Sequence, residues 1–560
     1  MAERNVAGQV LDALAAHGAS TVFGLPGVHN LAFWHEPERV PVVVRHEQAA
    51  VYAADGWARR TGRLGAAVVT TGPGAANTVA AFGEAAAAHS PVVLVASEIP
   101  QALRRPGRLR GVLHESRDQA ALFTPLAKAV FTPRTPAEAL RDVAAAAACA
   151  LREPRGPVYV DVPADVLGAE AVMSPPAHGP GEEDGPGTPA VSRPGHLAVV
   201  DTAPGTFVAS TPAGVDPEPA DLDAAAALLA GSRVVAWAGG AAVDAAGPLA
   251  ALADRLGAPL VTSYQARGCP GALGVPPHEP EVAALIGSAD VLLAVGGDLD
   301  GMNTRNWTMP RPPRLVTVDP VAPADPPEWT ADVAVTGGLD QALAGLLDRV
   351  PEQAGWARPG LRTQVLDRLR ADRATGEAVG LLDAVAAART RDTMLVCDMA
   401  VAGYWVGGYA EVPVPRGLAY PVGWGTLGFG LPAALGAAAT GAPVLAVCGD
   451  GGLMMGLGEL ATLVQERLPV TVLVVDDAGY GMLRYDQDQA GTRRAGVDLV
   501  TPDFLALAAS FGLPATGVPA ITEGLSEVLA GALRSGGPHL VRVPARLLPP
   551  RTTSPRWHEN

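Results

Sequence analysis

Two aspartates, Asp450 and Asp477, each follow a run of small apolar residues, at 444–448 and 470–475. Such runs predict buried strands of a parallel sheet. The carboxyl ends of neighbouring parallel strands open on one crevice, so we expect both carboxylates at the same site. Carboxylate oxygens, together with backbone and phosphate oxygens, form the ligand set that Mg²⁺ prefers. The pair therefore predicts a magnesium site that also holds a phosphorylated ligand.

The glycines around the first aspartate indicate how that ligand would bind. Gly449, Gly451 and Gly452 surround Asp450, and a segment with helical apolar spacing follows them. Glycine lets the backbone approach a ligand closely, and the free N–H groups of a helix start attract phosphate. A lone Gly-Asp-Gly is common in turns. The order strand, Gly-Asp-Gly, helix, strand, Asp-Asp is far more specific.

The elements that would position these residues alternate along the whole chain. Apolar runs predict strands at residues 21–24, 40–44, 65–71, 91–96, 157–162, 233–238, 290–296, 314–318, 393–397 and 538–543, besides the two above. Segments with helical spacing separate many of them. This alternation predicts an α/β fold with three doubly wound parallel-sheet domains.

Clusters of Pro and Gly suggest the domain boundaries. We expect an N-terminal domain at 1–172, a Pro/Gly-rich linker at 173–219, a central domain at 220–350 and a C-terminal domain at 375–548. Residues 549–560 are expected to form a tail, because the chain after about Leu547 is rich in Pro and Arg and lacks a core pattern.

Composition excludes several other classes. The 560 residues carry a net charge of −16, which disfavours binding to nucleic acid or anionic lipid. The four cysteines are far apart and form no Cys-x-x-Cys pair, so we expect reduced thiols rather than a zinc or redox motif. Neither a signal peptide nor a membrane-length apolar stretch is evident, which favours a cytoplasmic protein without a membrane partner.

Beyond these patterns, the C-terminal motif resembles that of the thiamine-diphosphate-dependent enzymes, such as acetolactate synthase, benzoylformate decarboxylase and pyruvate decarboxylase. The resemblance implies that Asp450 and Asp477 hold Mg²⁺ with the Gly479 carbonyl, and that the metal grips the cofactor diphosphate. Tyr480 and Gly481 would line the same cofactor site. The family usually has Asn-Asn where this chain has Asp476-Asp477, which adds negative charge beside a diphosphate.

The resemblance extends to the N-terminal region. The segment 45–50 matches the family's glutamate segment and implies that Glu47 is catalytic, through a hydrogen bond to the cofactor pyrimidine. The loops at 24–27 and 70–77 match those beside the pyrimidine. They supply further candidate cofactor-binding residues, namely Gly27, Thr71, Gly72, Pro73 and Asn77.

A third match lies at residues 423–432. By resemblance, the Gly425 carbonyl accepts from the pyrimidine amino group, and Leu427 is the bulky residue that bends the cofactor. The central region resembles the domain that binds FAD in acetolactate synthases. Its glycine pairs at 239–240 and 296–297 are usually structural, however, so FAD is not expected.

Histidines supply candidates for proton transfer, because their side chains titrate near neutral pH. His114 lies where acetolactate synthases carry Phe-Gln-Glu, and His29 lies beside the first matched loop. Each is also compatible with a purely structural role. Residues 113–119 resemble those of 2-oxoarginine decarboxylase in part, so Glu115 or Asp118 could bind a cationic substrate tail, or could be solvated loop carboxylates.

These features together predict an enzyme that decarboxylates a 2-oxo acid with thiamine diphosphate and Mg²⁺, and then releases an aldehyde or joins the remaining carbons to a second carbonyl. The alternatives are acetolactate synthase itself and a non-catalytic relative that only binds the cofactor. The resemblance also implies a homodimer or homotetramer, in which Glu47 of one subunit faces Asp450 of another.

Overall fold

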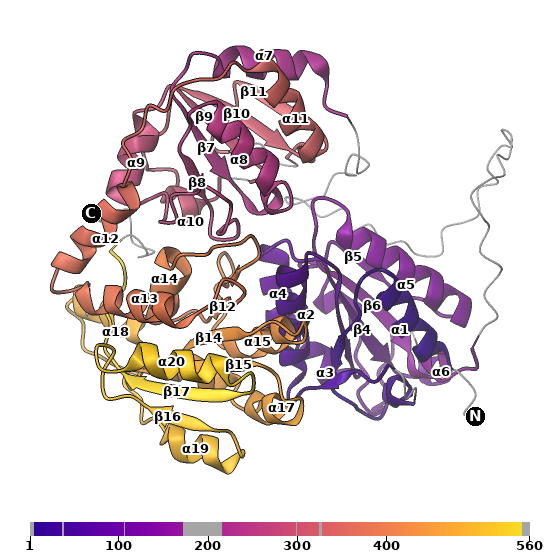
Figure 1. Ribbon diagram of the computed structural model, residues 1–560. Helices are drawn as coiled ribbons and strands as arrows, with labels where there is room; N and C mark the ends of the chain where they lie inside the picture. The colour runs from indigo at the N-terminus through magenta and orange to yellow at the C-terminus, as the bar shows by residue number, and fades with distance from the viewer. Residues whose placement is uncertain are drawn as a thin grey trace, which may run out of the picture.

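The computed structural model describes residues 5–35, 39–105, 107–171, 216–297, 299–323 and 327–551. It contains three parallel sheets, of six, five and six strands, and helices cover both faces of each (Figure 1). The three sheets follow one another along the chain, as the α/β pattern predicted. Among the described residues, no helix is long and apolar enough to cross a membrane.

The first sheet has the strand order β2-β1-β3-β4-β6-β5. Helices α1 and α5 pack on one face, and α2 and α4 pack on the other. The strands are β1 (Val22–Gly24), β2 (Val42–Val43), β3 (Gly65–Val69), β4 (Val92–Glu98), β5 (Ala129–Phe131) and β6 (Val158–Pro163). The helices are α1 (Val6–Ala16), α2 (Glu47–Thr61), α3 (Pro73–Ala76), α4 (Val79–Ala87), α5 (Pro136–Leu151) and α6 (Ala164–Leu167).

The third sheet repeats this topology, with the order β13-β12-β14-β15-β17-β16. Its strands are β12 (Met394–Cys397), β13 (Leu418–Ala419), β14 (Val444–Gly449), β15 (Val470–Asp476), β16 (Ala515–Gly517) and β17 (His539–Pro544). Its helices are α13 (Gly376–Ala388), α14 (Val401–Tyr409), α15 (Gly430–Ala438), α16 (Asp450–Met455), α17 (Glu459–Gln465), α18 (Gly481–Gln489), α19 (Phe504–Ser510) and α20 (Leu525–Arg534). Strand order reverses between β12 and β14, as it does between β1 and β3, and ligands bind at such points in open α/β sheets.

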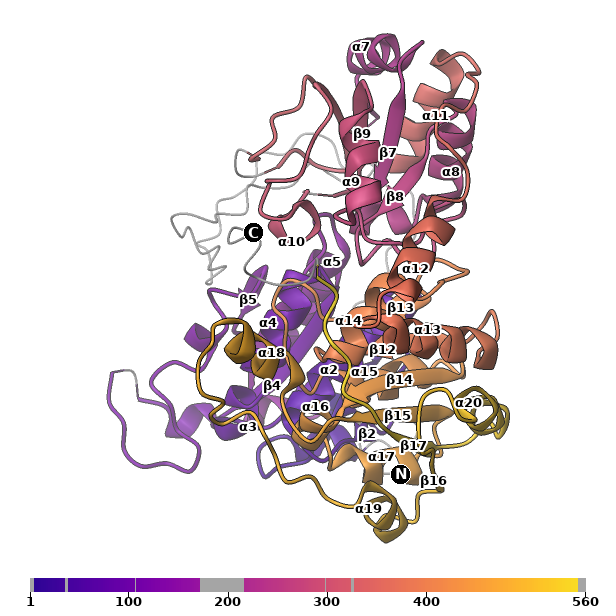
Figure 2. The same ribbon diagram turned by 90° about the vertical axis from the view of Figure 1, so that its left-hand side faces the viewer.

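The central sheet has the order β11-β10-β9-β7-β8. Its strands are β7 (Val234–Ala238), β8 (Leu260–Thr262), β9 (Val291–Val295), β10 (Arg314–Asp319) and β11 (Val333–Thr336). Its helices are α7 (Pro219–Leu229), α8 (Ala246–Arg255), α9 (Pro280–Gly287), α10 (Gly301–Thr304) and α11 (Leu339–Arg349), and α12 (Leu361–Ala371) leads on to the third sheet. In Figure 2, this region forms a lobe above the other two.

Helix α2 joins the first and third regions of the chain. Its start is capped by His46, whose Nδ1 accepts from the Gln48 N–H at 3.2 Å. Farther along, a Cβ on Gly56 would lie 2.0 Å from the Ala433 carbonyl oxygen, so glycine is required where α2 crosses α15. Tyr52 and Phe429 meet edge-to-face at 5.5 Å between ring centroids. One hydrophobic core therefore runs through both regions.

The ends of the expected domains differ in detail from the structure. The linker predicted at 173–219 falls largely outside the described residues, although α7 already begins at Pro219. The expectation that no core pattern follows Leu547 needs correction for the first residues of the tail. Pro549 and Pro550 are buried, and the Leu548 carbonyl accepts from Trp405 Nε1 at 2.8 Å. Residues 552–560 lie outside the described residues.

Candidate active site

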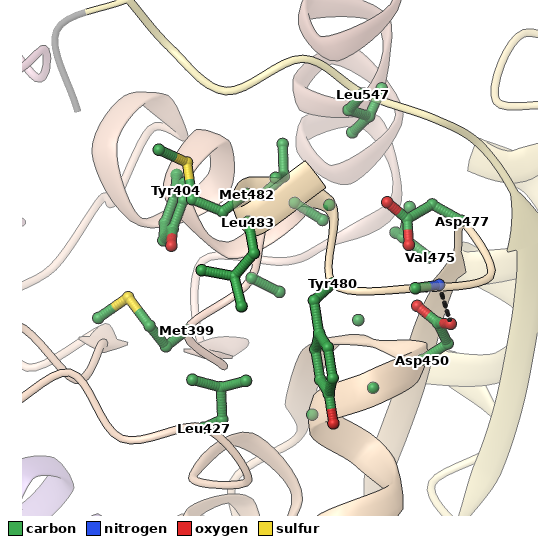
Figure 3. Close-up of a pocket in the computed structure, with 18 of the residues that line it drawn as sticks. Met399, Tyr404, Leu427, Asp450, Val475, Asp477, Tyr480, Met482, Leu483 and Leu547 are labelled. Atoms are coloured by element: carbon green, nitrogen blue, oxygen red, sulfur yellow. Dashed lines mark hydrogen bonds between the residues drawn. The ribbon is translucent and has the colours of Figure 1, made fainter. Parts of the chain in front are cut away.

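A pocket lies at the reversal point of the third sheet, where the loops after β12, β14 and β15 converge (Figure 3). Helices α14, α16 and α18 all begin at this pocket, and their first residues line it. The first N–H groups of a helix have no partner within the helix, and together with the helix dipole they attract phosphate. The lining residues at these starts include Ala400, Val401, Gly449, Gly451, Gly452 and Gly481.

Asp450 and Asp477 both line this pocket, at the ends of neighbouring strands β14 and β15. The Gly479 N–H donates to Asp450 Oδ2 at 2.9 Å, which holds the loop after β15 against the first carboxylate. Burial raises the pKa of Asp450. Burial, followed by the nearby charge of Asp450, raises the pKa of Asp477 to about 7.

This pair fits a divalent cation. Two buried carboxylates with raised pKa values are stabilised in the ionised form by a cation between them. No cluster of three or more His, Cys, Asp or Glu side chains suited to a metal occurs in the described part of the chain. Backbone and cofactor oxygens would therefore complete the coordination of a metal held by Asp450 and Asp477.

Two arginines that were not predicted as site residues balance the acidic Asp476-Asp477 pair. Arg542 donates to Asp476 Oδ2 from Nη2 at 2.7 Å. Arg484 is buried, and its Nη1 lies 3.3 Å from Asp477 Oδ2. Arg484 lies on α18 and Arg542 lies on β17, at very different distances along the chain from the Asp-Asp pair. No motif in the sequence therefore pointed to either arginine.

Asp398 was not predicted as a site residue. It lies directly after β12, is fully buried, and accepts from the N–H groups of Met399 at 2.7 Å and Gly428 at 2.9 Å. Burial raises its pKa to about 6, and the backbone hydrogen bonds oppose that rise. Because Gly428 follows Leu427, this carboxylate helps to hold the Leu427 loop at the pocket.

The segment that contains Gly425 is held by the first region of the same chain. Glu84 Oε2, on α4, accepts from Thr426 Oγ1 at 3.0 Å, and Glu84 Oε1 lies 3.2 Å from Arg59 Nη2 on α2. Gly425 has a φ of +76°, a conformation that favours glycine. The position of this loop therefore depends on packing between the first and third sheets.

A second cluster lies at the reversal point of the first sheet. A Cβ on Gly27 would lie 2.6 Å from Thr70 Cβ, so the loops after β1 and β3 are in close contact. Thr71 Oγ1 lies 2.9 Å from Ser97 Oγ, and the Gly72 N–H donates to Gln119 Oε1 at 2.5 Å. These bonds fix the turn that leads into Pro73 and α3.

Glu47 lies beside this turn, as the first residue of α2. Its Oε2 accepts from Asn77 Nδ2 at 3.0 Å, and a Cβ on Gly74 would lie 3.4 Å from its Oε1. The structure thus brings together the predicted glutamate and the predicted loop at 70–77. Strand β3 lies between Glu47 and this loop in the sequence, and the fold of the first sheet brings the two into contact.

The two candidate histidines form a pair. The rings of His29 and His114 meet edge-to-face, with 5.4 Å between their centroids. Each Nδ1 is buried without a hydrogen-bond partner among the described residues. Burial, and secondarily the charge of His114, lowers the pKa of His29. His114 also has a φ of +65°, a strained conformation of the kind that clusters at functional sites.

The first-region candidates do not line the pocket at Asp450. Glu47, His29 and His114 are absent from its lining, which comes from residues 399–547. A single chain therefore holds two separate clusters of candidate residues, which we call the first and second half-sites in anticipation of the proposal below. One is built on the loops after β1 and β3, and the other on the loops after β12, β14 and β15.

The glycine pairs of the central region serve backbone packing. A Cβ on Gly239 would lie 2.3 Å from the Gly296 carbonyl oxygen, and one on Gly296 would lie 2.5 Å from the Ala242 nitrogen. The loops after β7 and β9 therefore press directly against each other at the reversal point of this sheet. This contact requires glycine at Gly239, Gly296 and Gly297, whereas a Cβ on Gly240 would lie 2.4 Å from Gln265 Oε1.

Glycine loops and helix starts at the reversal point of a parallel sheet define an α/β protein that binds a phosphorylated cofactor. Comparison with protein families identifies that cofactor. Residues 4–122, 222–346 and 398–543 match the N-terminal, central and C-terminal domain models of thiamine pyrophosphate enzymes. The chain belongs to this family, and its first and third matched regions are thiamine-diphosphate-binding domains.

Similar proteins are related over nearly their whole length. A probable 2-ketoarginine decarboxylase of Pseudomonas aeruginosa is 33% identical, with 95% of this chain and 92% of that protein covered. A probable acetolactate synthase large subunit of Methanocaldococcus jannaschii is 29% identical, with coverage of 96% and 92%. The acetolactate synthase isozyme 2 large subunit of Escherichia coli is 27% identical, with coverage of 96% and 95%.

Proposed function

We propose that this protein is an enzyme that uses thiamine diphosphate and Mg²⁺ to decarboxylate a 2-oxo acid. The remaining carbons are either released as an aldehyde or joined to a second carbonyl compound. The observation that carries the proposal is the pocket where Asp450 and Asp477 meet three helix starts, within a domain of the thiamine pyrophosphate enzymes. The relatives, named as a decarboxylase and as acetolactate synthases, support the same chemistry.

The residues would divide the work as follows. Asp450 and Asp477, with the Gly479 carbonyl, would hold Mg²⁺, and the N–H groups around Gly449, Gly451 and Gly452 would bind the diphosphate. Leu427 and Tyr480, which line the pocket, would pack against the cofactor. Thiamine diphosphate, when bound, supplies an electron sink for the negative charge left on the substrate when CO₂ departs.

The residues of the first half-site would carry out proton transfer. Glu47, oriented by Asn77, would hydrogen-bond the cofactor pyrimidine. His29 and His114 would donate or accept a proton at the substrate, since their free Nδ1 atoms have no partner among the described side chains. Gly27, Thr71, Gly72 and Pro73 would shape the wall beside the pyrimidine.

A complete site requires a second subunit in this proposal. Because Glu47 does not line the pocket at Asp450 in one chain, the Glu47 half-site of a partner copy would close it. The half-exposed apolar side chains Trp424 and Met455, at 51% and 53% exposure, lie on the loop that contains Leu427 and at the end of α16. They provide apolar surface for such a dimer, or for a dimer of dimers. We place the enzyme in the cytoplasm.

Acetolactate synthase is the main alternative, favoured by the names of several relatives. The second alternative is a non-catalytic relative that only binds the cofactor. FAD has no part in the proposal, since Gly239, Gly296 and Gly297 serve close backbone packing in the central region.

The test combines cofactor binding with turnover. The wild-type protein and Glu47→Gln are titrated with thiamine diphosphate and Mg²⁺, and CO₂, aldehyde and acetolactate are measured with a panel of 2-oxo acids. We expect both proteins to bind the cofactor and only the wild type to release CO₂ at a substantial rate. Cofactor binding by the wild type without turnover of any 2-oxo acid would support the non-catalytic alternative.

A further inference from the structure

The start of helix α2, where Glu47 lies, is held by the third region of the same chain. Helix α17 lies beside β2, the strand that leads into α2 (Figure 2). Its first residue is Glu459, whose Oε1 accepts from the Arg45 N–H at 2.8 Å. The His46 N–H also donates to this carboxylate. The two residues directly before Glu47 are therefore anchored to a side chain that lies 414 positions after Arg45 in the sequence.

The Glu459 carboxylate is buried, and its described hydrogen-bond partners are all donors. The residue is 1% exposed, and Thr462 Oγ1 donates to its Oε2 at 2.7 Å. Burial raises the pKa of Glu459, and the hydrogen bonds from Thr462 and the Arg45 N–H oppose that rise. A buried carboxylate is costly unless donors replace the water that it loses. The N–H groups before Glu47 supply such donors.

A purely local role for Glu459 explains less. An acidic residue in the first turn stabilises its own helix through the helix dipole, and an exposed carboxylate does so without the cost of burial. Here the contacts reach into another region of the chain. A Cβ on Gly458 would lie 3.2 Å from Arg45 Cβ, and Gln465 Oε1 accepts from Arg45 Nη2 at 2.7 Å. Helix α17 thus contacts the segment before Glu47 at both of its ends.

From these contacts we propose that Glu459 is a positioning residue, which fixes the place of Glu47 by binding the N–H groups of the two residues before it. The proposal rests on the proposed function, in which Glu47 hydrogen-bonds the cofactor pyrimidine. Asn77 orients the Glu47 side chain, and Glu459 holds the backbone that carries it. Glu459 follows shortly after Asp450 in the sequence but does not line the pocket at Asp450. It therefore belongs to the first half-site.

A dimer with shared sites gives this assignment a definite consequence. Damage at Glu459 would affect the site to which its chain contributes Glu47, and not the site at its own Asp450. A catalytic group that is misplaced by about 1 Å can cost about a hundredfold in rate. Loss of the Glu459 anchor should therefore lower kcat, whereas cofactor affinity depends mainly on the Asp450 pocket and should be kept.

Glu459→Met tests the anchor in the cofactor-free protein. Methionine has nearly the size of glutamate but offers the Arg45 and His46 N–H groups no oxygen acceptor. We expect hydrogen exchange at these two amides, followed by mass spectrometry of peptides from residues 43–49, to become about tenfold faster or more. Glu466→Met, at the exposed end of α17, is the control and should leave this exchange unchanged. Wild-type exchange in Glu459→Met would overturn the proposal.

The holoenzyme tests the same variant through turnover. For the best 2-oxo acid, kcat for CO₂ release by Glu459→Met should fall about 10–100-fold, with the Kd of thiamine diphosphate within about twofold of the wild type. Glu459→Gln keeps one acceptor oxygen for the two N–H groups and should recover most of the lost rate. If Glu459→Met does not fold, Glu459→Asp, which keeps the charge but has a shorter side chain, replaces it with the same expectations. A wild-type kcat in the folded variant, or a loss of cofactor affinity as large as the loss in kcat, would overturn the proposal.

Mixed dimers distinguish a role at Glu47 from a general loss of structure. Refolding Glu459→Met with Asp450→Ala leaves one intact site in each mixed dimer and should restore up to about a quarter of the wild-type activity. Refolding Glu459→Met with Glu47→Gln damages both sites and should restore none. The reverse pattern, or restoration with neither where Glu47→Gln and Asp450→Ala restore each other, would overturn the proposal. A wild-type protein that releases no CO₂ from any 2-oxo acid would contradict the proposed function instead, and the exchange experiment would still test the anchor.

Discussion

Arg484 lies against Asp477, with 3.3 Å between Nη1 and Oδ2, and its Nη2 reaches the adjacent Ala478 carbonyl at 3.1 Å. The arginine thus contacts both a proposed metal ligand and the backbone that leads to Gly479. Arg542 makes a comparable ion pair with Asp476. The added negative charge of Asp476-Asp477, relative to the Asn-Asn usual in the family, is therefore balanced by two positive charges close by.

Loss of the Arg484 guanidinium should weaken metal binding. In Arg484→Met, the Asp477 side chain and the loop after it lose their support, and we expect the affinity for Mg²⁺ to fall about 10–100-fold. Calorimetric titration of Mg²⁺ in the presence of thiamine diphosphate measures this directly. Arg494→Met, which removes an exposed ion pair with Asp488, is the control and should bind Mg²⁺ as the wild type does.

Two inactive variants should complement each other if subunits share active sites. Glu47→Gln and Asp450→Ala damage different half-sites, so each alone should be inactive. A mixed dimer of the two contains one site with both changes and one site with neither. Unfolding and refolding an equimolar mixture should restore up to about a quarter of the wild-type activity. Activity that stays at the level of the separate variants, despite mixed dimers shown by mass spectrometry, would exclude a shared site.

Asp398 is expected to act by positioning the Leu427 loop. Asp398→Asn retains the size of the side chain but turns one acceptor oxygen into a donor that faces backbone N–H groups. We expect a loss of about 1–3 kcal/mol in the free energy of unfolding without cofactor, and about tenfold weaker binding of thiamine diphosphate. Thermal unfolding and cofactor titration measure the two effects. Asp383→Asn, at an exposed residue of α13, should change neither.

The histidine pair should shape the pH dependence of turnover. His114→Phe is expected to lower kcat by about 10²–10⁴-fold if His114 is a general acid or base. In the wild type, burial and His114 lower the pKa of His29, so the pair resists taking up two protons. His114→Phe also removes the neighbouring charge from His29, so protonation of His29 should extend to higher pH in that variant. A pH–rate profile of His114→Phe with the same inflections as the wild type would show that His29 does not titrate during turnover.

A buried carboxyl behind the first half-site should reduce stability as pH rises. Burial, followed by the charge of Glu98, raises the pKa of Asp161 to about 7, and Gln119 Nε2 donates to it at 2.7 Å. Between about pH 4 and 7, the unfolded chain ionises this group while the folded protein keeps it protonated, so stability falls over that window. In Asp161→Asn, the decrease in the free energy of unfolding over this pH window should be smaller by up to about 4 kcal/mol. Urea unfolding at pH 4.5 and 7.5 measures this decrease in the wild type and in the variant. An equal decrease in both proteins would refute the prediction.

Several expectations from the sequence depended only on local patterns. Continuous apolar runs located the central strands, because a strand buried on both faces has few polar residues. The strands that these runs did not mark are β5, β8, β11, β13 and β16, and every one lies at an edge of its sheet. Edge strands here are short, at two to four residues, and contribute too few buried positions for a recognisable pattern.

The sequence by itself determined the three-sheet α/β fold, the family and the order of the cofactor motifs, because each motif is a strand followed directly by its loop. The tertiary structure decided which distant side chains meet those loops. Asp398 at the N–H of Gly428 and His29 at the His114 ring are contacts between loops far apart in the sequence. Only the tertiary structure also separates Glu47 from the Asp450 pocket in one chain, because helix packing, and not sequence spacing, sets where each half-site faces.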